Sequence, residues 1–150
     1  MTEVKKARAV GINHVALEVG DIDEALEFYG KFLDFTLRGK HDTAAFIDLG
    51  DQFMALSKVD AQQRDHERHF GLVVDDKDAV RSVLDEIGVE IVSERFMDFY
   101  DPWGNRIEIV GYDGIQFTKA NNVLQGMGLD GLGKTNKAIQ ELTDKGMDPR

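Results

Sequence analysis

Cysteine is absent from the 150 residues of this chain, and proline occurs only twice. Without cysteine the chain can form neither a disulfide nor a thiolate metal site, so any bound metal would have to use His, Asp or Glu. This composition agrees with a cytoplasmic location, which we expect. No apolar run approaches the roughly 18 residues of a membrane span. The basic start MTEVKKARAV lacks the apolar run and cleavage site of a signal peptide. We therefore expect no membrane association.

Positive charge is also scarce, because 18 Lys and Arg stand against 28 Asp and Glu for a net charge of −10. Binding of a nucleic acid backbone depends on clustered Lys and Arg that release counterions, so nucleic acid is excluded as a partner. What the chain does contain is apolar material, at 42% hydrophobic residues. Its length suits one domain, or two half-size modules that share a core.

The chain contains an internal repeat with a period of about 55 residues. In the first half, a strand at 12–19 precedes an amphipathic helix with the sequence EALEFYGKFL, and three strands follow at 35–39, 44–49 and 52–57. In the second half, a strand at 69–74 precedes the helix AVRSVLDEI, and the strands that follow lie at 89–93, 95–100 and 105–110. HVALEVGD aligns with HFGLVVDD, and DLGDQFMAL aligns with DPWGNRIEI.

This repeat predicts an α+β fold of two tandem βαβββ modules, which form a curved, cup-shaped mixed sheet. We assign residues 10–60 to the first module and 66–112 to the second. Residues 113–150 lie outside the repeat and form a C-terminal extension with one predicted helix, at 136–145. We expect this extension to pack on the core or on a partner subunit.

His14 and His69 occupy matching positions in the repeat, and strand alternation places both on the side away from the helices. Glu108 lies on the corresponding side of the last strand. Two imidazoles and one carboxylate form a facial ligand set that leaves positions open on Fe²⁺, Mn²⁺ or Zn²⁺. The repeat position that matches Glu108 is Ala55, which cannot coordinate a metal. The sequence therefore predicts an open site with three protein ligands: His14, His69 and Glu108.

Other histidines and one motif offer competing interpretations. The motif HERH could pair His66 with His69 at helical spacing, but the repeat places His69 in a strand and His66 outside it. We interpret His66 and His41 as surface residues. The segment GLDGLGKT at 128–135 fits the phosphate-binding pattern GxxxxGK[ST]. That loop requires a buried strand before it and a nucleotide domain after it, and neither is indicated here.

Residues 10–112 resemble the vicinal oxygen chelate superfamily, which includes glyoxalase I, extradiol dioxygenases, bleomycin-resistance proteins and fosfomycin-modifying enzymes. The resemblance rests on INHVALEV, DIDEALEFYGKFLDF, IDLGDQFMAL, RHFGLVVDD and FYDPWGNRIEIV. It implies that His14, His69 and Glu108 bind a divalent metal, which could be Fe²⁺, Mn²⁺, Zn²⁺ or Ni²⁺. It also implies a homodimer whose sites are often shared between chains. Ala55 departs from the four-ligand arrangement of glyoxalase I.

The expected function is that of a metal-dependent enzyme acting on a small substrate with two vicinal oxygens, by glyoxalase-, dioxygenase- or fosfomycin-resistance-like chemistry. The alternative is a metal-free binding protein of the bleomycin-resistance type. The catalytic residues are unassigned. Side chains that could line the substrate pocket, chosen by strand parity, are Glu18, Asp98, Tyr100 and Arg106.

Overall fold

The structure, a computed structural model, describes residues 6–9 and 11–150. Much of the basic start and the first residue of the expected module 10–60 lie outside the described residues. The first βαβββ unit consists of β1 (His14–Val19), α1 (Ile22–Gly30), β2 (Leu37–His41), β3 (Ala44–Asp48) and β4 (Phe53–Lys58). Its sheet has the order β1-β4-β3-β2, in which β1 and β4 are parallel and the other pairs antiparallel.

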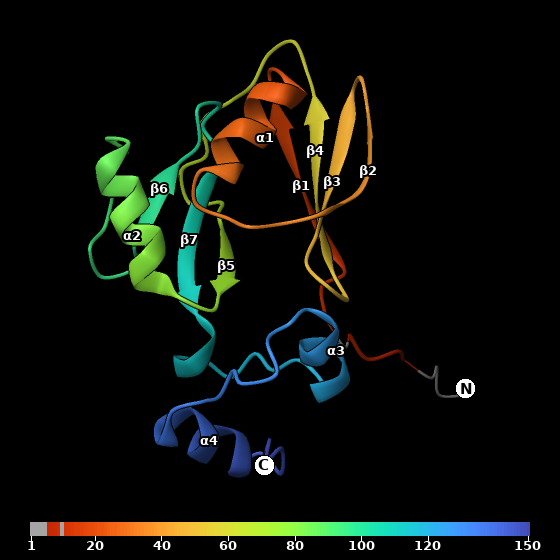
Figure 1. Cartoon of the computed structure of the whole chain (residues 1–150), viewed down its shortest axis with the longest axis vertical. Helices are drawn as coiled ribbons and strands as arrows, with labels where there is room; N and C mark the ends of the chain where they lie inside the picture. The colour runs from red at the N-terminus through yellow and green to blue at the C-terminus, as the bar shows by residue number, and fades with distance from the viewer. Residues whose placement is uncertain (1–5, 10) are drawn as a thin grey trace, which may run out of the picture.

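The second unit repeats this plan with one strand fewer in the described part of the chain. It consists of β5 (Phe70–Val74), α2 (Lys77–Glu86), β6 (Asp98–Tyr100) and β7 (Arg106–Gly111). The sheet order β5-β7-β6 matches β1-β4-β3 of the first unit, again with one parallel and one antiparallel pair. The mixed α+β class and its βαβββ plan are confirmed, although the strands divide into two sheets (Figure 1).

The strand expected at 89–93 is wrong, and the one expected at 95–100 is shortened. Only an isolated bridge joins Ser93 to Asp98. Met97 has a φ of +48°, a left-handed conformation that is uncommon for residues other than glycine. The Met97 amide donates to the Ser93 carbonyl at 2.7 Å. This tight turn leads into β6 and holds Val92 and Ser93 against its first residue, where the Val92 amide donates to the Asp98 carbonyl at 2.7 Å.

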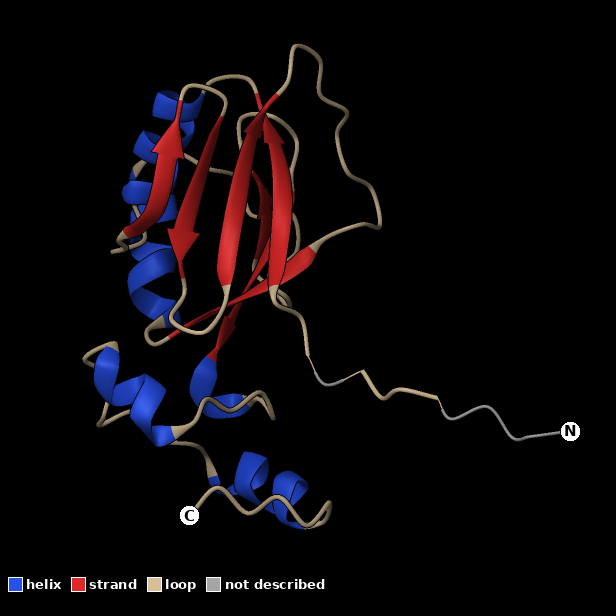
Figure 2. Cartoon of the chain, turned by 90° about the vertical axis from the view of Figure 1, so that its right-hand side faces the viewer, coloured by secondary structure: helices blue, strands red, loops and turns tan. Residues whose placement is uncertain are grey.

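Helices α1 and α2 lie on one side of the strands (Figure 2). Both start at an aspartate whose side chain caps the first turn: Asp21 accepts from the Glu24 amide at 2.9 Å and Asp76 from the Ala79 amide at 3.0 Å. The helices cover one face of the sheets, and the alternating strand side chains on that face are buried. The opposite face, which we call the open face, carries the candidate site residues.

The two units share one hydrophobic core on the helix-covered side. Phe28 of α1 and Phe32 in the turn after α1 pack against Phe99 of β6, with ring centres 6.5 and 5.5 Å apart. The Tyr29 hydroxyl donates to Asp101 Oδ2 at 2.7 Å across 72 positions of sequence. Burial and the neighbouring Asp101 carboxylate raise the pKa of Tyr29 well above its ordinary value. Helix α1 therefore packs against both sheets on their helix-covered face and does not cover their open faces.

The C-terminal extension contains a short 3₁₀ helix (Tyr112–Gly114), α3 (Asn121–Gly126) and α4 (Asn136–Thr143), and lies beyond one end of the sheets (Figure 1). The helix expected at 136–145 corresponds to α4, whereas α3 was not predicted. Lys134 of the GLDGLGKT segment donates to the carbonyls of Tyr112 and Ile115 at 2.6 and 2.8 Å. Helix α3, not a buried strand, precedes this segment, so the segment lacks the structural context of a phosphate-binding loop. Lys134 instead holds the start of the C-terminal extension through these two hydrogen bonds.

None of the helices within residues 6–9 and 11–150 has the length and apolar character that crossing a membrane requires.

Candidate metal and substrate site

The open face of β7 presents a carboxylate directly beside a histidine. Glu108 pairs in register with Gly71 of β5 and with Asp98 of β6, so the three share one row across the second sheet. His69 immediately precedes β5, and its Nε2 lies 3.5 Å from Glu108 Oε2. The other ring nitrogen of His69, Nδ1, lies 2.8 Å from the Glu67 carbonyl oxygen. That contact fixes the ring with Nε2 directed at Glu108, as is usual for a metal-binding histidine.

His14 is held in a similar way on the first sheet. Its Nδ1 lies 3.0 Å from the side-chain oxygen of Asn13, and its ring stacks on Phe53 of β4 at 4.7 Å with an interplanar angle of 9°. The guanidinium of Arg38 lies 5.0 Å from the centre of the same phenyl ring. Phe53 thus fixes the plane of the imidazole and leaves its Nε2 available to a ligand.

An ion pair occupies the open face next to Glu108. The guanidinium of Arg106 contacts Asp98 Oδ2 through Nε at 2.7 Å and Nη2 at 2.5 Å. The hydrogen bond that Arg106 donates to Asp98 raises the pKa of Arg106, against the opposing effect of desolvation. Asp98 is only 2% exposed, and within the described residues its Oδ1 has no hydrogen-bond partner. The Asp98 carboxylate and the Arg106 guanidinium therefore lie beside the pair formed by His69 and Glu108.

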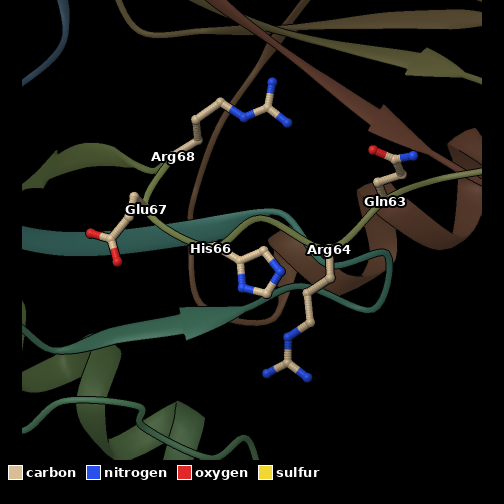
Figure 3. A pocket seen from close by; sticks show the side chains of 5 residues that line it. All are labelled: Gln63, Arg64, His66, Glu67 and Arg68. Atoms are coloured by element: carbon tan, nitrogen blue, oxygen red, sulfur yellow. The ribbon is translucent and has the colours of Figure 1, made fainter.

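The segment between the two sheets covers part of this second open face. The Tyr100 hydroxyl donates to the Asp65 carbonyl at 2.9 Å, and the Arg106 amide donates to Asp65 Oδ2 at 3.2 Å. Gln63, Arg64, His66, Glu67 and Arg68 line a surface hollow of about 520 Å³ there (Figure 3). Figure 3 shows the side chains of Arg64 and Arg68 extending to opposite sides of the segment. His66 is exposed, as expected, and so is His41 at the end of β2.

The predicted site residues thus fall into two groups. His69, Glu108, Asp98, Tyr100 and Arg106 gather on the second open face, whereas His14 and Glu18 lie on β1 of the first. Among residues 6–9 and 11–150, no three His, Asp or Glu side chains are close enough to hold one metal ion. One chain therefore offers a half-site with two ligands and, separately, a single histidine.

Sequence reasoning missed the two aromatic residues on the first open face. Phe53 stacks on His14, and Phe46 of β3 meets Phe53 edge-on at 6.0 Å. The repeat contained a signal for Phe53, because its position in β4 corresponds to that of Arg106 in β7. No signal pointed to the backbone carbonyl of Glu67, since any residue could supply it.

Comparisons with known proteins agree with this fold. The family model of the Glyoxalase/Bleomycin resistance protein/Dioxygenase superfamily matches residues 11–109, and the chain belongs to this superfamily. It is 26% identical over 110 residues to glutathione transferase FosA of Serratia marcescens, covering 65% of this chain and 78% of the relative.

Similar folds occur in solved structures. The fosfomycin resistance protein FosX of Listeria monocytogenes superposes with a TM-score of 0.57 at 16% identity, over 69% of this chain and 94% of that one. Lactoylglutathione lyase of Agrobacterium tumefaciens gives a TM-score of 0.56 at 20% identity, over 71% and 96%. These structures support the fold.

Proposed function

We propose that this chain is a divalent-metal-dependent enzyme acting on a small molecule with two adjacent oxygens, and that it works as a homodimer. In the proposed dimer, His14 of one chain joins His69 and Glu108 of the other, so that two equivalent sites form. The observation that carries this proposal is the 3.5 Å approach of His69 Nε2 to Glu108 Oε2, with Nδ1 of that histidine already engaged. We also expect a cytoplasmic location, which stays a prediction.

The donor set suits a divalent ion. Two imidazole nitrogens and one carboxylate are ligands that Fe²⁺, Mn²⁺, Ni²⁺ and Zn²⁺ accept, and three protein ligands leave room for a substrate. The side chains of His69 and Glu108 are 45% and 22% exposed, so a third ligand can reach them from outside the chain. A bound ion would supply Lewis-acid stabilisation to adjacent substrate oxygens that gain negative charge.

The surrounding residues contribute orientation and charge. Arg106 is fixed by Asp98 and offers positive charge beside Glu108, while Tyr100 holds the covering segment through its hydroxyl. We assign Asp98, Tyr100 and Arg106 to the pocket wall from the second module, and Glu18 to the wall from the first. Relatives such as glutathione transferase FosA and lactoylglutathione lyase are enzymes, which supports the proposal that this chain is also an enzyme. The proposal includes glyoxalase-, dioxygenase- and fosfomycin-resistance-like reactions.

Metal analysis of single variants tests the ligand set. The purified protein is expected to bind close to one divalent ion per chain, and Glu108→Gln to lose most of it, because the charge that neutralises the ion is removed while size is kept. His66→Ala and His41→Ala serve as matched controls and should keep full metal. Full metal in Glu108→Gln together with loss in His66→Ala would overturn the assignment.

A mixed dimer tests whether sites are shared. A chain carrying His14→Ala is combined with one carrying Glu108→Gln, and the heterodimer is isolated with two different affinity tags. Shared sites predict that one of the two sites regains all its ligands, so metal content returns to about half that of the wild type. Sites within single chains predict no recovery.

A metal-free binding protein would instead bind its ligand equally well in the presence of a chelator.

A further inference from the structure

The C-terminal extension has a surface hollow of its own. The hollow has a volume of about 580 Å³ and lies among the 3₁₀ helix, α3 and α4. Its volume is within the range of roughly 300 to 1,000 Å³ that is typical of small-molecule sites. The superfamily model ends at residue 109, before any residue of this hollow. The hollow therefore belongs to a part of the chain that the two modules do not include.

Much of the wall of this hollow is apolar. Leu124 of α3 is buried, and Leu132 and Ile139 are half-buried. The ring of Tyr112 completes this wall, and Phe117 packs edge-on against that ring with the ring centres 6.3 Å apart. Such a wall favours an aliphatic group, because the group leaves water when it binds.

Three cationic residues also line the hollow, although the whole chain has a net charge of −10. Two of them have carboxylate partners, since Lys119 pairs with Asp51 in the turn before β4 and Arg150 pairs with Asp148 at 2.7 Å. The third is Lys134, which forms no ion pair with a carboxylate of residues 6–9 and 11–150. Lys134 is therefore the cation of this hollow that a bound anion can neutralise.

The ammonium of Lys134 is fixed in position by uncharged groups. Its Nζ donates to the carbonyls of Tyr112 and Ile115 at 2.6 and 2.8 Å, and lies 3.7 Å from the centre of the Tyr112 ring. Desolvation lowers the pKa of Lys134, and the charge of Asp113 opposes this shift more weakly. An ammonium carries three N–H donors, and two of them are used here. One donor and one positive charge remain for a ligand.

We propose that this hollow binds a monocarboxylate with an aliphatic chain, whose carboxylate pairs with Lys134 and whose chain lies against Leu124, Leu132 and Ile139. Hydrogen bonds between charged groups are about twice as strong as those between neutral ones. A single negative charge suits the hollow because Lys119 and Arg150 already have carboxylate partners. The inference goes beyond the proposed function, since none of these residues belongs to the metal or substrate site.

Isothermal titration calorimetry of the purified protein with a homologous series tests the contribution of the chain. Acetate, butanoate and hexanoate share the carboxylate and differ in length. Their affinity is expected to rise roughly two- to fourfold for each added methylene group, because each group leaves water for the apolar wall. Hexanol, which has the chain without the charge, should bind roughly tenfold more weakly than hexanoate. Inorganic phosphate, which has charge without a chain, should also bind more weakly than hexanoate.

Substitutions separate the ammonium from the apolar wall. Lys134→Met removes the charge and should weaken hexanoate binding roughly tenfold, whereas Lys134→Arg keeps the charge and should retain most of the affinity. The matched control is Lys137→Met, at an exposed position of α4 outside the hollow, which should change nothing. Leu132→Ala should flatten the rise of affinity with chain length, and Leu129→Ala, also outside the hollow, should not.

The outcomes decide for or against this inference without involving the proposed function. Because Lys134 also holds the extension, circular dichroism checks the fold of Lys134→Met, and if that variant is misfolded the chain-length dependence of Leu132→Ala decides. Failure of hexanoate to bind would overturn the inference, and so would equally tight binding of hexanol or inorganic phosphate. Glu108→Gln should bind hexanoate as tightly as the wild type. Loss of hexanoate binding in Glu108→Gln would mean that the carboxylate binds at the metal site, and would also overturn the inference.

Discussion

The two modules agree on their helix-covered side and differ on their open faces. Asp21 and Asp76 cap α1 and α2 in the same way, and the fully buried Tyr29 and Leu84 occupy matching helix positions. On the open faces, by contrast, the apolar row of Ala16, Ala55 and Phe46 corresponds to the charged row that contains Glu108 and Asp98.

This contrast separates what the fold requires from what the chemistry requires. Side chains on the covered face must fill a close-packed core, so both copies of the repeat keep apolar residues there. Side chains on the open face carry no such constraint and can specialise. We infer that the second module supplies charge and two metal ligands, whereas the first supplies one ligand.

The largest expected effect concerns two aspartates at matching places in the repeat. Asp101 is buried and accepts hydrogen bonds from the Tyr29 hydroxyl, the Asn105 side chain and the amides of Trp103 and Asn105. Asp48 is half-exposed and pairs with Arg38 at 2.6 Å. Asp101→Ala leaves several buried donors unpaired and should lower the free energy of unfolding by roughly 3 to 4 kcal/mol. Asp48→Ala should cost less than about 1 kcal/mol.

Urea denaturation of both variants measures the difference. Equal losses in Asp101→Ala and Asp48→Ala would mean that the turn before β7 has no special role in joining the modules. A large loss confined to Asp101→Ala would confirm that this turn carries the link to α1.

A smaller effect is expected when the open faces are made alike. Ala55→Glu places a carboxylate at the position that corresponds to Glu108, and it should tighten metal binding by roughly tenfold through a fourth ligand. Ser57→Glu, one row further along β4 on the same face, is the matched control. Competition with a fluorescent zinc chelator measures the affinity, and equal tightening in both variants would contradict the row assignment.

The smallest expected effect is on the pH dependence of the free energy of unfolding. Tyr29 of the first module can titrate, whereas Leu84, at the matching position of the second module, cannot. The raised pKa of Tyr29 means that, above pH 10, the unfolded chain loses a proton that the folded chain keeps. Stability contributed by this group is therefore complete below pH 10 and lost as pH rises, by roughly 1 kcal/mol between pH 10 and pH 11. Tyr29→Phe should show a shallower alkaline decline in thermal melts, whereas an unchanged slope would contradict the linkage.

Much of the fold followed from patterns within single segments. Alternating residues at 14–19 and 106–111, the acidic helix starts and the repeat itself predicted the order of the elements, because each depends on local periodicity. The strand at 89–93 was mispredicted, because its β-branched residues favour a strand but the tight turn from Ser93 to Met97 leaves a single bridge, from Ser93 to Asp98. The candidate ligands were identified from repeat register, and they stay a prediction.

The sequence by itself determined the duplicated plan, the side of each strand that faces the helices, and the positions of His14, His69 and Glu108 on the other side. Only the tertiary structure decided that His69 lies against Glu108 while His14 is held elsewhere by Phe53. It also decided that Phe46 takes the place of Asp98 in the first module. The physical reason is that local periodicity fixes the face of a strand. Which side chains meet depends instead on strand register, turn length and the way α1 packs behind both sheets, and these arise from contacts distant in sequence.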